Sequence, residues 1–362
     1  AIDATTWAFQ HGLLAMLEGD ASAALRHMDD AVCSGADSGW PLREHIALIG
    51  RALALAEVGR FGDADAALQV ARAHPFQRAG VWHPWIEALV EARLADLAGD
   101  DTRCLRALRE ALALARAHGY NFGPLPYSSP ALMPRLMARA LAHGIEPAMC
   151  QAIIRRHALE APPEAGEHWP WTLRLRGFGR LRIERDERDG APPPRKEGRK
   201  PLEMLKIVLA LGGSAPVDRL TDALWPDADG DLARKSFDNA LHRLRRRLGG
   251  DQHLLLRAGT LSLNAGSCWT DVGAAQALLS RAADAPADGT LQALAARLSR
   301  LTLAPLLDGD DAPPALAAAR AAASARLRDG MATLARRLAA AGDKEAARIV
   351  QCQLDMFASS AG

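Results

Sequence analysis

The segment DLARKSFDNALHRLRRRL, residues 231–248, is the most informative part of the chain because it reads as a helix with one apolar and one cationic face. At about 100° per residue, its large apolar side chains fall on one stripe. The stripe consists of Phe237, Leu241, Leu244 and Leu248, and the opposite side carries Lys235, Asn239, His242, Arg243 and Arg246. Six basic residues and one aspartate between residues 234 and 248 give a local charge of +5, whereas the whole chain has +1. Such a concentration of basic charge is typical of a phosphate-binding helix.

The flanking sequence predicts a small domain that combines strands and helices. Trp171–Arg185 alternates apolar residues with arginines, which favours two short antiparallel strands. Further expected elements are a helix that begins at Pro201 and runs to Leu211, a helix over Val217–Leu224, and a hairpin over Leu254–Leu263 that turns at Ala258 and Gly259. Asp231 is expected to cap the cationic helix. Strands, three helices and a terminal hairpin together predict a winged helix.

Within residues 169–271, four motifs carry a family resemblance: RKPLEMLKIVLALGG, LTDALWPDADGD, ALHRLRRRLG and LLLRAGTLSLNAGSCWTDV. They resemble the OmpR/PhoB-type winged-helix domain of bacterial transcriptional regulators. The resemblance is closer to regulators that carry a bacterial transcriptional activator domain, as the SARP group does, and to large regulators with MalT-like helical repeats. It implies a DNA-binding domain at 168–269 and a helical activator domain at 270–362. Gly273 and Ala274 depart from the pattern, because family members often have an aromatic residue there.

The resemblance also implies which residues contact double-stranded DNA. The residues expected near base edges or flanking phosphates are Lys235, Ser236, Asn239 and Arg243, those on the backbone are His242, Arg245 and Arg246, the wing residue is Arg257, and the residues at the preceding helix start are Arg199 and Lys200. Asn239 has the chemistry to read adenine and Arg243 the chemistry to read guanine. The alternative is that residues 245–247 form a solvated helix end that the helix dipole favours.

Residues 1–160 contain an internal repeat of about forty residues. Gly19, Gly59 and Gly99 recur at that interval, each between two apolar helical patterns. A period of this length predicts stacked helical hairpins, in which glycine provides the left-handed turn. The positions expected to lie between paired helices are Ala24, Ala64, Cys104, Met28, Leu68, Leu108, Ala31, Ala71 and Ala111. The predicted fold class is therefore mainly α, with helical, tetratricopeptide-like repeats flanking an α+β winged-helix domain.

The repeats are expected to offer a concave surface to an effector or a partner protein. The aromatic segment 82–85, WHPW, is interpreted as packing between successive hairpins, with a ligand groove as the alternative. The loop 227–231, DADGD, has an acidic alternation like that of a calcium loop, but Leu232 stands where an EF-hand needs glycine. The family resemblance instead implies that this loop faces RNA polymerase.

Composition and missing motifs narrow the class of protein. With 362 residues, of which 49% are hydrophobic and 5% aromatic, the chain is expected to form two or three mainly helical domains. The five cysteines stand far apart, which argues against a disulfide framework or a zinc site. Neither a membrane-spanning apolar run nor a signal peptide is recognisable, so we expect a cytoplasmic bacterial protein without a membrane partner. The start at Ala1 rather than Met is the pattern expected of the carboxy-terminal part of a longer polypeptide.

Enzyme signatures are also missing from the sequence. We find no phosphate-binding loop, dinucleotide fingerprint, zinc-protease motif or nucleophile elbow. We therefore expect no enzyme activity, no catalytic residues, no cofactor and no metal. The predicted function is that of a sequence-specific transcriptional regulator, an activator that reads promoter DNA, contacts RNA polymerase and is able to form homo-oligomers. The alternative is a protein-interaction scaffold whose winged helix does not read DNA.

Overall fold

The computed structural model describes residues 2–38, 41–75, 82–120, 132–186, 198–286, 289–302, 304–308 and 313–359. These residues are mainly helical, as the sequence predicts. The chain divides into two compact units, residues 1–170 and 171–362. Each unit is described separately below.

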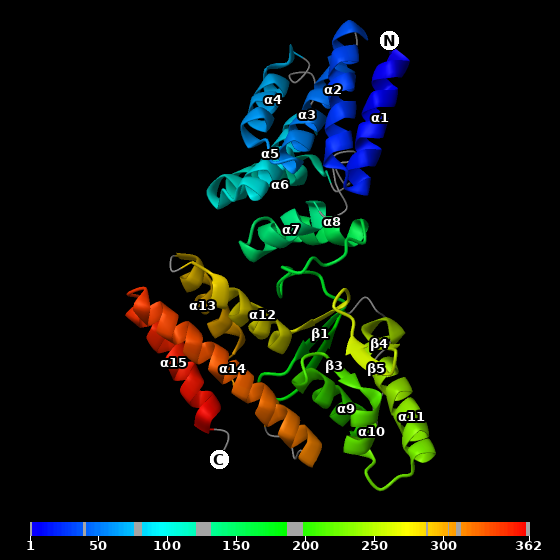
Figure 1. The fold of residues 1–362 in the computed structure, drawn as a ribbon, viewed down its shortest axis with the longest axis vertical. Helices are drawn as coiled ribbons and strands as arrows, with labels where there is room; N and C mark the ends of the chain where they lie inside the picture. Colours follow the sequence, from blue (N-terminus) through cyan, green and yellow to red (C-terminus); the bar gives the residue numbers. More distant parts are fainter. Residues whose placement is uncertain are drawn as a thin grey trace. The chain divides into compact units, whose positions relative to one another are not determined.

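The first unit consists of helices (Figure 1). Its helices are α1 (Ile2–Glu18), α2 (Ala21–Ser38), α3 (Pro41–Glu57), α4 (Phe61–Ala73), α5 (Trp82–Ala98), α6 (Asp101–His118), α7 (Leu132–Ala142) and α8 (Pro147–Arg156). Short turns join α1 to α2, α3 to α4 and α5 to α6, and each of these turns contains a glycine with positive φ. The glycines are Gly19 (φ 82°), Gly59 (79°) and Gly99 (74°), a conformation that costs other residues a steric penalty.

The side chains between the paired helices match the expected spacing. All nine residues predicted at those positions, from Ala24 to Ala111, are 0% exposed. Helix α5 lies at the centre of this unit, and its side chains from His83 to Asp96 are buried except for Pro84. Helix α5 packs against α3, α4, α6 and α7, and it also buries charged residues, which the following subsection describes.

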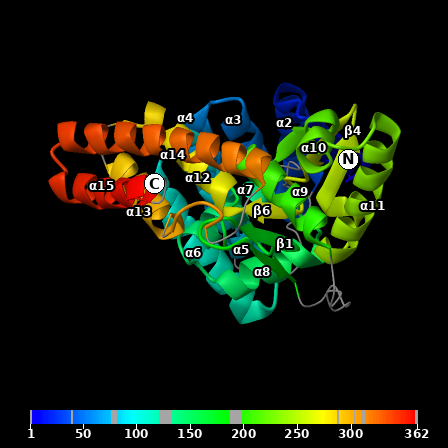
Figure 2. The same cartoon turned by 90° about the horizontal axis from the view of Figure 1, so that it is seen from below.

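The second unit combines two small sheets with helices. Its elements are β1 (Leu173–Arg176), β2 (Arg182–Arg185), α9 (Arg199–Ala210), β3 (Ser214–Pro216), α10 (Val217–Leu224), α11 (Gly230–Leu248), a 3₁₀ turn (Asp251–His253), β4 (Leu254–Arg257), β5 (Thr260–Leu263), β6 (Cys268–Thr270), α12 (Asp271–Asp284), α13 (Gly289–Leu301), α14 (Pro314–Ala340) and α15 (Lys344–Ser359). The strand orders are β2-β1-β6 and β3-β5-β4. Figures 1 and 2 show α11 at one edge of this unit, with α14 and α15 toward the opposite edge.

The antiparallel pair of β1 with β2, helix α10 and the β4–β5 hairpin agree with the sequence prediction. Strands β3 and β6 were not predicted. Each has three residues, and β6 pairs in parallel with β1 although Leu173 and its partner Cys268 are far apart in the sequence. Such short strands form only because a neighbouring strand provides hydrogen-bond partners. Their own three residues therefore do not predict a strand from the sequence.

Two helix starts differ from the prediction. Helix α9 begins at Arg199, two residues before Pro201, with Gly198 in the extended conformation that precedes a helix. Proline is tolerated throughout the first turn, because the amide hydrogens there have no partner within the helix. Helix α11 is capped by Asp229 rather than Asp231: the Asp229 carboxylate accepts the amide of Leu232 at 3.0 Å. Asp231 instead lies in the first turn, where the helix dipole stabilises a negative charge.

A continuous hydrophobic core runs through the whole second unit. It includes Leu173 of β1, Leu205 of α9, Leu244 of α11, Leu298 of α13 and Phe357 of α15. Helix α14 packs against both α9 and α10. The two segments expected at 168–269 and 270–362 therefore share one core.

Candidate nucleic-acid interface

Helix α11 is fixed to its unit by the predicted apolar stripe. Phe237, Leu244 and Leu248 are 0% exposed and Leu241 is 4% exposed. The helix packs on α9 and α10 and ends at Gly249, which has a φ of 101°. The burial of these apolar side chains thus determines which face of α11 points outward.

The opposite face of α11 is polar and cationic, and its side chains are exposed. Its exposed residues are Lys235, Asn239, His242, Arg243 and Arg246. The side chains of these five residues form no hydrogen bond or ion pair with other described residues. Ser236 beside them is half-buried. The free donors on this face are available to an external ligand.

Other charges on the same helix are already paired. Arg234 lies 3.7 Å from Asp238 and 5.5 Å from the ring centroid of Phe237. Arg245, which the family resemblance assigns to the DNA backbone, donates from Nη2 to the carbonyl oxygen of Leu254 at 2.8 Å. It therefore joins the end of α11 to β4. The dipole at the helix C-terminus favours a cation here as well.

The start of α9 lies next to the exposed face of α11. A Cβ atom built on Gly198 would lie 3.7 Å from Nη1 of Arg243. Arg199 and Lys200 follow directly and are exposed, so two elements bring three predicted cations into one region. Glu203 lies 2.6 Å from Arg199 and 3.5 Å from Lys200. This buried carboxylate orients both side chains and offsets part of their charge.

The hairpin presents the remaining predicted cation. Arg257 is exposed at the end of β4, and its side chain forms no hydrogen bond or ion pair with described residues. Ala258 (φ 46°) and Gly259 (φ 70°) form the tight turn that follows. Two consecutive residues with positive φ match the twist of a two-residue hairpin.

Arg185 was missed by sequence reasoning. It ends β2, and its guanidinium lies beside the C-terminus of α11, since a Cβ built on Gly249 would lie 3.0 Å from Nε of Arg185. The alternation of arginines in 171–185 predicts a strand but not which arginine meets α11. Only the pairing of β2 with β1 and the position of β1 in the sheet determine that contact.

The acidic loop before α11 borders a surface cavity of about 440 Å³. Trp225 and Pro226 line it together with Asp218 and Asp222 of α10. Leu232 on the next turn is 56% exposed. The loop region therefore offers apolar and acidic groups to a partner.

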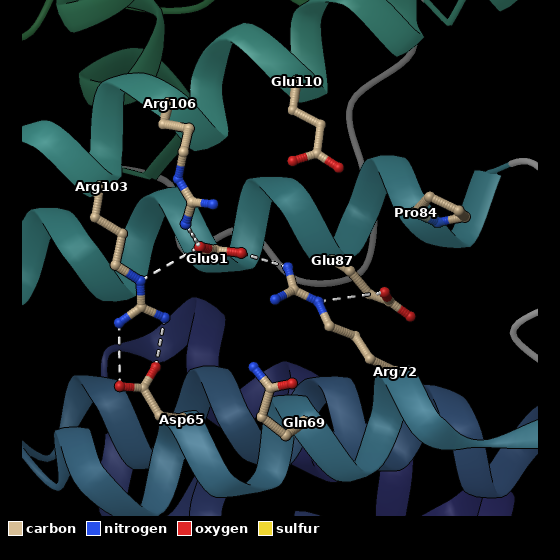
Figure 3. A pocket seen from close by; sticks show the side chains of 9 residues that line it. All are labelled: Asp65, Gln69, Arg72, Pro84, Glu87, Glu91, Arg103, Arg106 and Glu110. Carbon is tan, nitrogen blue, oxygen red and sulfur yellow. Dashed lines mark hydrogen bonds and ion pairs between the residues drawn. The ribbon is translucent and has the colours of Figure 1, made fainter.

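The first unit contains a polar groove of about 630 Å³ between α4, α5 and α6 (Figure 3). At its floor, Glu91 of α5 is 5% exposed and binds three arginines. Arg72 forms one ion pair with it, while Arg106 and Arg103 lie 2.5 Å and 3.3 Å away. Burial alone would raise the pKa of Glu91, but the hydrogen bonds from Arg72 and Arg103 outweigh this effect and leave the pKa below its usual range.

A buried polar cluster adjoins the groove. Nε2 of His45 lies 3.3 Å from Glu87, and the ring of His45 is 4.6 Å from that of His83. His83 is 1% exposed, and burial followed by the nearby His45 lowers its pKa to about 4. Its neighbour Trp85 is 1% exposed and lies 5.2 Å from the ring of Tyr120. Trp85 is thus a packing residue, and the side chain of Trp82 lies outside the described part.

The described residues include neither a helix suited to a membrane nor a cluster of metal ligands. No helix there combines the length and apolar content needed to cross a bilayer. No group of three or more histidine, cysteine, aspartate or glutamate side chains there could hold a metal ion. Comparison with protein-family models, curated proteins and solved structures gave no match to the chain.

Proposed function

We propose that the chain is a transcriptional regulator that reads double-stranded DNA with α11, within a winged helix formed by residues 168–269. The main support for this proposal is that one face of α11 is buried, whereas the polar and cationic side chains of the other face are exposed and form no hydrogen bonds or ion pairs with described residues. An α-helix fits the major groove, where each base pair presents a distinct pattern of hydrogen-bonding groups. In this assignment Asn239 reads adenine and Arg243 reads guanine.

Further cations contribute phosphate contacts in this proposal. Lys235, His242 and Arg246 flank the reading residues on α11. Arg199 and Lys200 approach the backbone from the start of α9, and Arg257 enters the adjacent minor groove from the hairpin. Phosphate contacts fix the register of a protein on DNA but do not read its sequence. Arg245, which is bound to Leu254, serves to hold the hairpin against α11.

We further propose that the regulator is an activator whose loop before α11 contacts RNA polymerase. The support is the exposed Leu232 next to the cavity lined by Trp225. The helices of the first unit, interpreted as tetratricopeptide-like repeats, would receive an effector or a partner protein. The candidate location is the polar groove of about 630 Å³ around Glu91, because charged side chains from three helices line it. No enzyme activity, cofactor or metal is part of this proposal.

The alternative function is a protein-interaction scaffold whose winged helix does not read DNA and serves as a protein-binding module. Salt dependence separates the two. Binding through about six phosphates should weaken linearly on a log-log plot, with a slope of about −0.9 per phosphate neutralised.

The test is a selection of bound sequences from a random duplex library by the purified chain at two salt concentrations. Arg243→Ala is compared with Arg348→Ala, which removes the same charge from an exposed position of α15. We expect the same enriched motif for the parent chain and for Arg348→Ala, and a motif without preference at one base pair for Arg243→Ala. Binding without any motif would contradict sequence reading, and no binding at either salt concentration would favour the scaffold.

A further inference from the structure

The polar groove between α4, α5 and α6 has an excess of negative charge (Figure 3). Four carboxylates and three guanidinium groups line it, which gives the lining a net charge of −1. The charged residues are Asp65, Glu87, Glu91 and Glu110, and Arg72, Arg103 and Arg106. Among the described residues that line the groove, Pro84 alone is apolar. A ligand that fits this groove must therefore be polar itself.

All three arginines of the groove are already bound to carboxylates. Arg103 lies 2.5 Å from Asp65 and 3.3 Å from Glu91. Arg106 lies 2.5 Å from Glu91, and Arg72 forms a third ion pair with this carboxylate. An anion that entered the groove would have to compete with these carboxylates for the arginines.

Two carboxylates lie one helical turn away from these ion pairs. Glu87 precedes Glu91 by four residues on α5, and Glu110 follows Arg106 by four residues on α6. Because a short turn joins α5 to α6, the two helices run in opposite directions, and both carboxylates lie on the same side of the Glu91–Arg106 pair. Glu110 is exposed and forms no hydrogen bond or ion pair with other described residues.

Glu87 is the buried member of this pair. It is 2% exposed, and its Oε1 accepts no hydrogen bond from a described residue. Its ion pairs are long, with Nε2 of His45 at 3.3 Å and Nε of Arg72 at 3.7 Å. A buried acceptor without a hydrogen bond is unfavourable, and a carboxylate can accept several. Glu87 therefore retains the capacity to accept hydrogen bonds from a ligand in the groove that it lines.

We propose that the polar groove binds a small organic cation, a linear aliphatic amine whose ammonium group lies between Glu87 and Glu110. This inference rests on the effector-binding role proposed above for the first unit and names the chemical class of the effector. A volume of about 630 Å³ lies in the range of small-molecule sites. An ammonium group donates several hydrogen bonds, and those to carboxylates are strong because both partners are charged.

Two further observations define the class of cation. The described residues include no group of three metal-ligating side chains, which favours an organic cation over a metal ion. Pro84 offers a small apolar surface for an alkyl chain, whereas no aromatic side chain is among the described residues that line the groove.

The test is a calorimetric titration of the full chain with spermidine and with cadaverine, two linear amines of different length, at about 150 mM salt, where weak surface attraction is screened. We expect saturable binding of one amine molecule per chain. Glu110→Gln should weaken this binding about tenfold, because a charge-assisted hydrogen bond is lost. Arg106→Gln should strengthen it about threefold, because the groove becomes more negative at a position where the arginine side chain is 67% exposed.

Each variant has a matched control outside the groove. Glu18→Gln on α1 and Arg109→Gln on α6 remove the same charges from exposed positions and should leave the affinity unchanged. Circular dichroism should show unchanged helix content in all four variants, since they alter exposed side chains.

Three results would overturn the proposal. They are the absence of binding of either amine, equal affinities of Glu110→Gln and Glu18→Gln, and weaker binding by Arg106→Gln, which would indicate an anionic ligand. The titration contains no DNA, so its failure is distinguishable from a failure of α11 to read DNA, which the duplex selection measures without amine.

Discussion

Oδ1 of Asp271 accepts the backbone amide of Gly177 at 2.7 Å, which ties the first turn of α12 to the end of β1. The same carboxylate accepts the amides of Phe178 at 3.1 Å and Val272 at 2.8 Å. Asp271 is 3% exposed. One buried side chain thus satisfies three backbone donors at the junction between the small sheet and the C-terminal helices.

We predict that Asp271→Asn lowers the free energy of unfolding of the second unit by about 1–3 kcal/mol, the usual cost of leaving a buried donor unsatisfied. The amide nitrogen of asparagine cannot accept a hydrogen bond, so at least one backbone amide loses its partner. Urea denaturation measures the effect. Asp284→Asn, at an exposed position of the same helix, should differ from the parent by less than about 0.5 kcal/mol. Equal stability of the two variants would contradict the junction role.

Arg243→Ala should weaken binding to the selected DNA site by about 1–3 kcal/mol, which is the discrimination that one bidentate base contact provides. Fluorescence anisotropy with labelled duplex measures the change. The variant should also lose preference at one base pair of the site, because a reader has been removed. A uniform loss of affinity over all sequences would show that Arg243 contacts phosphate instead.

Arg257→Ala should weaken binding to all sequences by a similar factor and reduce the magnitude of the salt slope by about 1, because it removes one phosphate contact. The measurement is the affinity at a series of salt concentrations. Arg257 is exposed and its turn is formed by Ala258 and Gly259, so folding should be unaffected. A salt slope equal to that of the parent would remove the hairpin from the interface.

The first unit should lose stability in acid through His83. Its pKa is lowered from 6.5 to about 4 in the folded protein, first by burial and then by His45. Between these two pH values the unfolded chain binds more protons than the folded one, so stability falls as the pH falls. His83→Gln should therefore lose less melting temperature between pH 7 and pH 4.5 than the parent does. His118→Gln, at an exposed position of α6, should behave like the parent; equal acid sensitivity of both variants would refute the role of His83.

Glu91→Gln should lower the free energy of unfolding by about 1–3 kcal/mol, because Arg72, Arg103 and Arg106 lose the buried carboxylate that they share, while Arg72 keeps Glu87 and Arg103 keeps Asp65. Urea denaturation of the full chain measures this loss. Glu110→Gln provides the control, since Glu110 lines the same groove but is exposed. If both variants kept the stability of the parent, Glu91 would not organise the groove.

Local sequence patterns predict the features of this chain that depend on neighbouring residues. Helix α10 has the predicted bounds, and the turn at Ala258 and Gly259 lies where those two residues indicate. The apolar stripe of α11 was predicted because helical periodicity acts within a few turns. In contrast, β6 requires β1 from a distant part of the chain. The contact of Arg185 with the end of α11 could not be predicted for the same reason, because it also joins residues that are far apart in the sequence.

The polar groove of the first unit is the clearest case in which local sequence patterns do not predict the structure. Glu91 is bound by arginines from α4 and α6, two helices that flank α5 in the sequence. Helical periodicity gives no reason to bury a glutamate, and a buried charge is recognisable only once its partners are in place. Arg245 is a further example, because its sequence position suggests solvent, whereas the structure shows it bound to Leu254.

The shared core of the second unit limits which gene segments can be exchanged by recombination without loss of folding. Helix α14 packs on α9 and α10, and Arg326 of α14 donates to the carbonyl oxygen of Ala210 at 3.4 Å. A gene fragment that ended near residue 270 would encode α9 and α10 with the apolar side chains facing α14 open to water. Such a product would be prone to aggregate, so exchange of this segment between genes is expected to carry residues 171–359 together.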